Sequence, residues 1–464
     1  MKIEEAKAPE STASKKTRFK FVIMVSSVAA FGGLLFGYDT AVIAGAIGFL
    51  QTKFGLSATM TGWAASSAIW GCILGVVSAG YMSDAVGRKK VLILSAILFA
   101  VSAVGSAIPN NLTQFVMARF IGGIGVGAAS ILSPLYIAEI APADKRGFLV
   151  TLYQLAIVIG INLIYFINLK IAGLGDEAWN VEYGWRYMLG SEVIPASLFF
   201  FMLLFVPESP RWLASKGKTQ PALAILERVN GKEQSLKVLK DIHDALKEEK
   251  GTIKELFSRG LRAALVVGVV LALFSQITGI NAIIYYAPEI LKSIGLGRDT
   301  ALMQTVIVGV TNTLFTFVAI AFIDKLGRRT LLMWGVSGMI ICLFAIGTLF
   351  YLNWSSGPWL LIFIIGFIAS FASSLGPIPW VMISEIFPTK TRGIAMSFAT
   401  VILWIGVVLI TQLTPMMLEG MGGAFTFYIF MINAVVLLVF TYRLIPETKG
   451  KTLEEIEKSW KKNG

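Results

Sequence analysis

Long apolar stretches separated by short polar segments recur along the chain from Phe21 to Leu444. Each stretch has about the 17–25 residues that a helix needs to cross a bilayer core of roughly 30 Å. Most stretches are apolar on all sides, which indicates helices that contact lipid rather than one soluble core. We therefore predict an all-α membrane protein with twelve transmembrane helices. The predicted spans are 20–50, 61–83, 91–108, 113–139, 148–171, 187–206, 263–288, 301–323, 330–352, 358–386, 394–417 and 424–444.

The polar segments between the spans differ in charge. Those after spans two, four, eight and ten read GRKK, PADKRG, DKLGRR and PTKTRG, whereas other loops, such as PNN and WNVEYG, carry few cations. Because positive loops stay on the cytoplasmic side, we predict a multi-pass protein of the cell (inner) membrane with both termini cytoplasmic. The first twenty residues are too acidic for a secretory signal, and they form a longer polar segment before the first apolar stretch than such a signal has.

Three motifs occur twice at nearly one spacing. The motif at Asp84-x-x-Gly-Arg recurs at Asp324, 240 residues later. Glu139-Ile-Ala-Pro recurs as Glu385-Ile-Phe-Pro, 246 later, and Pro207-Glu-Ser recurs as Pro446-Glu-Thr, 239 later. This periodicity predicts two six-helix parallel pseudo-repeats. The predicted division is an N-terminal tail (1–19), a first half (20–206), a linker (207–258), a second half (259–445) and a C-terminal tail (446–464).

The linker contains two segments with helical spacing, QPALAILERVN and SLKVLKDIHDALKEEK. In the second segment Leu236, Leu239, Ile242 and Leu246 fall on one side, as in a short amphipathic helix on the cytoplasmic face. The alternative is a solvated linker that only joins the halves.

Composition narrows the class of protein. Of the 464 residues 56% are hydrophobic and 15% are charged, against about 25% charged in soluble domains. The net charge of +12 is explained by orienting loops, so nucleic acid is not an expected partner. Cys72 and Cys342 stand alone in apolar stretches and His243 is the only histidine, so we expect neither a metal site nor a disulfide framework.

Charged residues at span ends and inside spans carry the candidate chemistry. Asp39 falls within the first span, where a carboxylate costs roughly 2.5–3.5 kcal/mol. The duplicated motifs predict a cytoplasmic gate of ion pairs that form in one state and separate in another. The alternative is that their charges only set topology. The predicted gate residues are Asp84, Arg88, Glu139, Arg146 and Glu208 in the first half and Asp324, Arg328, Glu385, Arg392 and Glu447 in the second.

Several longer motifs point to one family. They are GGLLFGYDTAVIAG at 32, GYMSDAVGRKK at 80, RFIGGIGVG at 119, SPLYIAEIAPADKRG at 133, PESPRWL at 207, GINAIIYYAPE at 279, DKLGRR at 324, PWVMISEIFPTKTRG at 379 and PETKGKTLEEIE at 446. With these motifs the chain resembles, nearly end to end, the sugar porters of the major facilitator superfamily, and most of all the bacterial arabinose–proton and xylose–proton symporters.

The resemblance implies a role for the carboxylate in the first span. Asp39 matches the proton acceptor of the proton-coupled members, and Arg119 on the fourth span matches its partner. In the facilitators that this chain resembles, the position matching Asp39 is asparagine, which cannot titrate. An aspartate at this position therefore favours symport over passive transport. The alternative is that Asp39 is a water-exposed hydrogen-bonding group without coupling.

The resemblance also implies a sugar site, because amides suit hydroxyl groups and aromatic rings suit the apolar face of a sugar. Polar amides in spans can instead join helix to helix. The expected sugar-binding residues are Gln154, Gln276, Asn281, Tyr285, Tyr286, Asn312 and Trp380, with Phe36, Ser275, Gly376 and Trp404 as further candidates. Gly376-Pro-Ile-Pro is also expected to break or kink the tenth span.

Three positions depart from the xylose-type pattern. Ser275 and Ile161 occupy positions at which the xylose-type members have glutamine. Leu403 occupies a position on the eleventh span at which the family has a residue with an amide side chain. Each change removes a partner for a hydroxyl group, so we expect a monosaccharide with a different hydroxyl pattern, first a pentose such as arabinose or xylose, with a hexose as an alternative. A passive facilitator, a myo-inositol–proton symporter and a non-transporting sensor remain alternatives.

An enzyme is not expected, because no nucleophile–base constellation appears. A nucleotide-driven pump is not expected either, because the two GKT strings lack the glycine five residues upstream. The expected partners are a monosaccharide, a proton and the lipid bilayer, with a monomeric chain and no cofactor.

Overall fold

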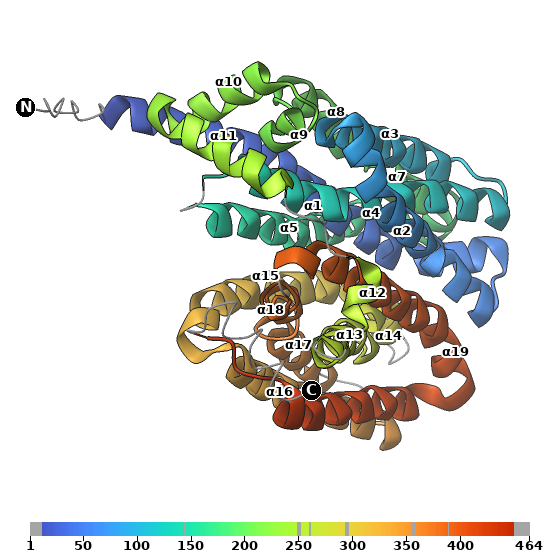
Figure 1. The fold of residues 1–464 in the computed structure, drawn as a ribbon. Helices are drawn as coiled ribbons and strands as arrows, with labels where there is room; N and C mark the ends of the chain where they lie inside the picture. Colours follow the sequence, from blue (N-terminus) through green and yellow to red (C-terminus); the bar gives the residue numbers. More distant parts are fainter. Residues whose placement is uncertain are drawn as a thin grey trace, which may run out of the picture.

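A computed structural model of the chain describes residues 12–142, 145–247, 252–258, 261–292, 297–354, 358–387 and 389–449. All regular elements in these residues are helices. Figure 1 shows two helical bundles, one built from the N-terminal helices and one from the C-terminal helices, with the linker helices α9, α10 and α11 (within residues 210–247) beside the first and α12 (Ile253–Leu256) beside the second.

The first bundle holds six spans. They are α1 (Thr12–Phe54), α2 (Ala58–Val86), α3 (Arg88–Ala107), α4 (Leu112–Ile140), α5 (Arg146–Ala172) and a sixth span built from α6 (Glu177–Trp179), the π-helix η1 (Asn180–Gly184), α7 (Trp185–Gly190) and α8 (Val193–Phe205).

The prediction for the sixth span was wrong at its start. WNVEYG, predicted as a loop, is helical, and the span begins at Glu177 rather than at 187. The Asp176 side chain accepts a hydrogen bond from the Trp179 N–H at 2.8 Å, so it caps the helix. Asn180 Nδ2 donates to the carbonyl oxygen of Ala172 at 2.9 Å. These polar side chains start a helix where hydropathy indicates none.

The linker folds as predicted into short helices, α9 (Pro210–Ser215), α10 (Thr219–Asn230), α11 (Lys232–Lys247) and α12 (Ile253–Leu256). Leu239 is buried and Ile242 packs against the same small core under α10. Leu236 and Leu246 are exposed, so the expected four-residue apolar side is wrong for these two. Leu236 lies at the edge of the buried stripe and Leu246 lies near the end of α11, beyond the buried core.

The second bundle holds the remaining spans. Its helices are α13 (Arg262–Ile277), α14 (Ile280–Lys292), α15 (Arg298–Leu326), α16 (Arg328–Tyr351), α17 (Pro358–Ala372), α18 (Ile378–Ile386) and α19 (Thr389–Leu444).

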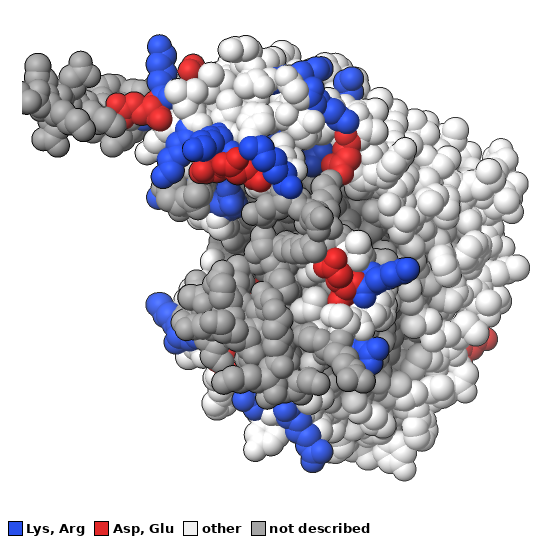
Figure 2. All heavy atoms as spheres, viewed as in Figure 1, with Lys and Arg blue, Asp and Glu red and all other residues white. Residues whose placement is uncertain are grey.

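The described helices account for twelve spans. Ten are long and apolar enough to cross a membrane. One of these, from Gly393 to Leu444, contains a non-helical residue at Gly422 (φ 77°) and so comprises two spans. The shorter apolar helix α17, continued by α18, supplies the tenth span. The break between them covers residues 373–377 and so includes Gly376 and Pro377, where a break or kink was predicted. Figure 2 shows lysines, arginines and acidic residues gathered at one side of the molecule, with a broad uncharged surface over the bundles.

The two bundles meet over only part of their length. Ser66 on α2 donates to Gln412 Oε1 on α19 at 3.0 Å. Asn162 on α5 donates to Thr313 Oγ1 on α15 at 2.6 Å, and Tyr165 donates to a carbonyl oxygen of α14 at 2.6 Å. These bonds lie from the middle of the spans toward the end that carries residues 54–57, here called the 54–57 end. The opposite end, which carries Asp84 and Arg88, is called the motif end.

Candidate functional site

Asp39 and Arg119 form an ion pair inside the first bundle. Asp39 on α1 is 0% exposed and Arg119 on α4 is 2% exposed. Arg119 Nη1 donates to Asp39 Oδ1, and Nη2 donates to the backbone carbonyl oxygen of the same residue at 2.8 Å. The pair is therefore held at two points and does not depend on water. The alternative of a water-exposed Asp39 does not fit this burial.

Polar atoms of this pair remain unsatisfied. Among the described residues, Asp39 Oδ2 and Arg119 Nε have no hydrogen-bond partner. Glu192, at the junction of α7 and α8, is 1% exposed and interacts electrostatically with both residues. Two carboxyl groups therefore lie near one guanidinium.

Glu192 was missed by the sequence analysis. It falls inside the predicted span 187–206, and a carboxylate there is as costly as one in the first span. That signal was sufficient to find it.

Gln276 and Asn281 meet across a break in the seventh span, which was predicted as one helix. α13 ends at Ile277, α14 begins at Ile280, and Gly279 between them has a φ of 96°. On an unbroken helix the two amides would point about 140° apart. Across the break, Asn281 Nδ2 donates to Gln276 Oε1 at 2.6 Å.

Ser275 completes this polar group. Gln276 Nε2 donates to Ser275 Oγ at 3.0 Å, and the Ser275 hydroxyl donates to the carbonyl oxygen of Ala272 at 2.7 Å. The serine thus orients the glutamine amide, and the remaining donor and acceptor sites of Gln276 and Asn281 are available to a ligand.

Aromatic residues lie on both sides of the contact between the bundles. The rings of Phe36 on α1 and Trp404 on α19 are 5.4 Å apart. Trp404 Nε1 is buried without a hydrogen-bond partner among the described residues. Tyr285 and Tyr286 on α14 are buried, and the Tyr286 hydroxyl donates to the carbonyl oxygen of Thr411 at 2.8 Å. The unsatisfied indole N–H is therefore a free donor within the membrane-spanning region.

The other predicted sugar residues stand apart from these contacts. Gln154 on α5 is half-buried and Asn312 on α15 is buried, and neither side chain has a hydrogen-bond partner among the described residues. Gly376 lies between α17 and α18, and Trp380 on α18 is 37% exposed. The structure brings Ser275, Gln276 and Asn281 together and pairs Phe36 with Trp404. It shows no hydrogen bond from that group to Gln154, Asn312 or Trp380.

At the motif end, Arg88 joins three elements of the first bundle. Its Nε and Nη2 donate to the two carboxylate oxygens of Glu139 at 3.0 and 3.1 Å, and Nη1 donates to Asp84 Oδ1 at 2.9 Å. Glu208 Oε1 accepts from the backbone N–H groups of Arg88 and Lys89 at 3.0 and 3.1 Å. Glu208 therefore caps the N-terminus of the neighbouring helix α3.

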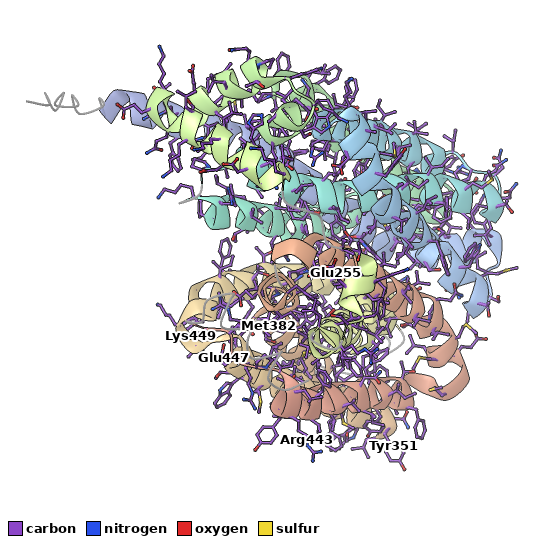
Figure 3. The ribbon with its side chains drawn as sticks, viewed as in Figure 1. Glu255, Tyr351, Met382, Arg443, Glu447 and Lys449 are labelled. Atoms are coloured by element: carbon purple, nitrogen blue, oxygen red, sulfur yellow. The ribbon has the colours of Figure 1, made fainter. Side chains whose placement is uncertain are left out.

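The second bundle repeats this arrangement. Arg328 Nη2 donates to Glu385 Oε1 at 2.9 Å. Glu447 accepts from the backbone N–H groups of Arg328 and Arg329 at 2.9 and 3.1 Å, at the start of α16. Figure 3 labels Glu447 near Met382 and Lys449 in this bundle.

A hydroxyl group supports each central glutamate in the same way. Ser209 Oγ donates to Glu139 Oε2 at 2.5 Å, and Thr448 Oγ1 donates to Glu385 Oε2 at 2.6 Å. Each ion pair described at this end joins two residues of the same bundle, so each bundle carries its own network.

Three predicted gate residues are not placed in these networks. Arg146 is exposed and has no ion-pair partner among the described residues, so its pairing in another state stays a prediction. The side chains of Asp324 and Arg392 lie outside the described part of the chain.

Known sugar transporters are similar to this chain over nearly its whole length. Residues 25–460 match the family described as "Sugar (and other) transporter". An arabinose–proton symporter of Bacillus subtilis (strain 168) is 47% identical over 453 residues, 97% of this chain and 98% of that protein. A D-xylose–proton symporter of Escherichia coli (strain K12) is 41% identical over 472 residues, 95% and 96% of the two chains.

A solved structure shares the fold. The partially occluded inward-open conformation of the xylose transporter XylE from E. coli aligns with a TM-score of 0.84 at 41% identity, covering 93% of this chain and 100% of that one. The twelve spans therefore adopt the major facilitator fold, and the relatives are transporters rather than enzymes. The chain belongs to the sugar transporter family.

Proposed function

We propose that this chain is a sugar–proton symporter that imports a monosaccharide by alternating access, with a pentose such as arabinose or xylose favoured. The observation that carries the proposal is the buried contact of Asp39 with Arg119, which leaves Asp39 Oδ2 without a partner. In this proposal Asp39 Oδ2 accepts the proton, and the distance between Asp39 and Arg119 controls its protonation.

The proton acts through the charge of the pair. When Asp39 Oδ2 takes up a proton, the attraction to Arg119 weakens, and the guanidinium is free to shift toward Glu192. When the proton leaves, the two-point contact with Asp39 forms again. Occupancy by a proton thus changes how α1 and α4 are held together.

The sugar binds between the bundles in this proposal. Gln276 and Asn281 supply hydrogen-bonding groups, and Trp404 offers an N–H that is unsatisfied among the described residues. Gln154 and Asn312 supply further amides. Trp380, partly exposed, supplies a ring for the apolar face of the sugar. The arabinose–proton symporter among the relatives supports a pentose as first choice.

Transport follows from where the bundles touch. Their hydrogen bonds lie from the middle of the spans toward the 54–57 end, and the basic motif end is assigned to the cytoplasm by the positive-inside rule. The state described here is then inward-open, as in the aligned XylE structure. The proposal places a monomer in the inner membrane with both termini cytoplasmic, and residues 207–258 as the linker between two halves.

Uptake assays test this proposal. Radiolabelled arabinose, xylose, galactose, glucose and myo-inositol are offered to transporter-deficient cells carrying the wild type or Asp39→Asn, with and without a protonophore. We expect concentrative pentose uptake that is lost with the protonophore and in Asp39→Asn, while exchange of sugar across the membrane survives in the variant.

Other outcomes separate the alternatives. Uptake that ignores both treatments would make the chain a passive facilitator. Uptake of myo-inositol alone would change the substrate class, and no uptake of any sugar would favour a sensor.

A further inference from the structure

A cavity lies at the 54–57 end, where the two bundles meet. Its volume is about 610 Å³, within the range of about 300–1,000 Å³ that small-molecule sites occupy. Helices α1 and α2 of the first bundle line it, together with α14, α16 and α19 of the second. A ligand there would contact both bundles at once.

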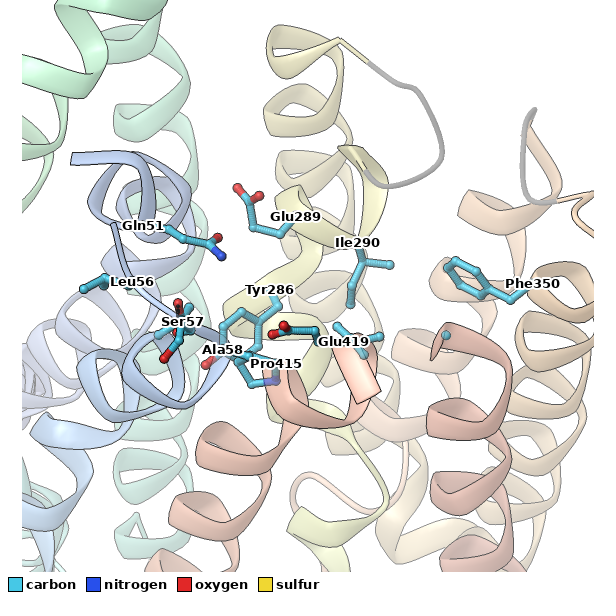
Figure 4. Close-up of a pocket in the computed structure, with 13 residues that line it drawn as sticks. Gln51, Leu56, Ser57, Ala58, Tyr286, Glu289, Ile290, Phe350, Pro415 and Glu419 are labelled. Atoms are coloured by element: carbon cyan, nitrogen blue, oxygen red, sulfur yellow. Dashed lines mark hydrogen bonds between the residues drawn. The ribbon is translucent and has the colours of Figure 1, made fainter. Parts of the chain in front are cut away.

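The lining combines the groups that recognise a sugar. Gln51 has an amide that both donates and accepts, and Glu289 and Glu419 have carboxylates that accept from hydroxyl groups. Tyr286 and Phe350 supply aromatic surface. Figure 4 shows Gln51 directed toward Glu289, with Tyr286 and Glu419 bordering the same space.

The cavity adjoins the central site along one helix. Asn281 and Tyr286 both lie on α14, and five residues of helix rise only about 7.5 Å. Tyr286 is buried, and its hydroxyl donates to the carbonyl oxygen of Thr411. Tyr286 lines the cavity, and its bond to α19 holds it in place.

We propose that this cavity is an outer vestibule that binds a monosaccharide before it reaches the central site. The inference rests on the proposed function. The vestibule is available in the state described here, in which the bundles are joined at this end, so a second sugar can bind outside while the first leaves inside.

A sugar fits the cavity better than a metal cation. Glu289 is already paired with Lys292 at 2.8 Å, which leaves Glu419 as the carboxylate in the lining without an ion pair among the described residues. A calcium ion takes 6–8 oxygen ligands, and two carboxylates, one of them engaged by a lysine, do not meet that need. The aromatic surface adds nothing for a cation of this kind but suits a sugar ring.

Kinetics measured from the two sides of the membrane test the vestibule. The variants are Gln51→Leu, Glu419→Gln and their combination, with Thr52→Val as control, because Thr52 is the next residue on α1 and does not line the cavity. KM is measured for entry into cells, and for exit from preloaded cells with a protonophore present. Since one lost hydrogen bond changes binding by about three- to tenfold, we expect the entry KM to rise by that factor in each single variant and by more in the combination, with exit KM unchanged.

Each result decides the question. An entry KM within twofold of wild type in the double variant, or entry and exit KM rising together, would overturn the vestibule. A fall in maximal rate alone reports reduced abundance and, with entry KM unchanged, also counts against it. Wild type that transports no sugar contradicts the proposed function instead, so the two failures are distinguishable.

Discussion

Arg119 holds Asp39 at two points, the carboxylate and the backbone carbonyl oxygen of the same residue. The contact therefore fixes both the charge of the aspartate and the position of α1 against α4. Because neither residue reaches solvent, the loss of one partner leaves the other charge buried and uncompensated.

The first prediction concerns stability of this pair. Arg119→Leu is expected to destabilise the protein by about 3–5 kcal/mol, since it leaves a buried carboxylate without its cation. The double variant Asp39→Asn with Arg119→Leu should recover most of that loss, because no ionised partner remains in the pair. Thermal unfolding of the detergent-solubilised protein measures both. Equal melting temperatures for the single and double variants would contradict the prediction.

The second prediction concerns the glycines that precede α3 and α16. Gly87 and Gly327 have φ values of 107° and 91°, and a Cβ at either would press on Glu208 or Glu447. Gly87→Ala and Gly327→Ala are expected to cost about 1–3 kcal/mol from backbone strain alone, because their φ and ψ values lie in a region essentially confined to glycine, and to weaken the helix cap. Melting temperature and uptake rate should both fall. Gly80→Ala is the control, because its Cβ meets no neighbouring atom and the residue lies within α2. A loss of similar size at Gly80 would argue against this explanation.

The third prediction concerns the contact between bundles. Gln412 accepts from Ser66 at 3.0 Å and donates to the carbonyl oxygen of Thr59 at 3.1 Å. Gln412→Leu removes both bonds and should shift the population away from the state described here. Labelling of a cysteine placed at Thr61, in a background lacking Cys72 and Cys342, should then become severalfold faster. Thr59→Val leaves its carbonyl group in place and should not change the rate. Identical rates in the two variants would show that the bonds do not set the balance.

The fourth prediction concerns the linker. Leu239 is buried under α10, whereas Leu236, three residues before it, is 62% exposed. Leu239→Ala should destabilise the linker helices by about 2 kcal/mol or more, and Leu236→Ala should change their stability by less than about 0.5 kcal/mol. Hydrogen exchange of the α10 and α11 amides reports the difference. Rapid exchange in the wild type would instead favour a linker without a packed core.

Hydropathy was sufficient to predict most of the spans because lipid demands long apolar helices. It failed where polar side chains organise the backbone. Asp176 and Asn180 start the sixth span in a segment of low hydropathy. Gly279 breaks the seventh span between Gln276 and Asn281. Neither feature follows from a periodic pattern.

The candidate site was predictable to a different extent. The resemblance was enough to pair Asp39 with Arg119, and the structure shows their contact. Glu192 was not predicted, although a carboxylate within an apolar span is itself a signal in the sequence. The role of Glu208 depends on tertiary packing, because a carboxylate that caps a helix distant in sequence leaves no local signal.

The separate networks at the motif end bear on how the polypeptide can be assembled. Arg88 with Glu139 and Arg328 with Glu385 are each completed by residues of their own bundle, including the glutamate that follows its last span. A chain divided after Lys247 would leave both sets intact. The two fragments, synthesised separately, should each fold with their own ion pairs and helix caps formed. They should then associate in the membrane into a working transporter.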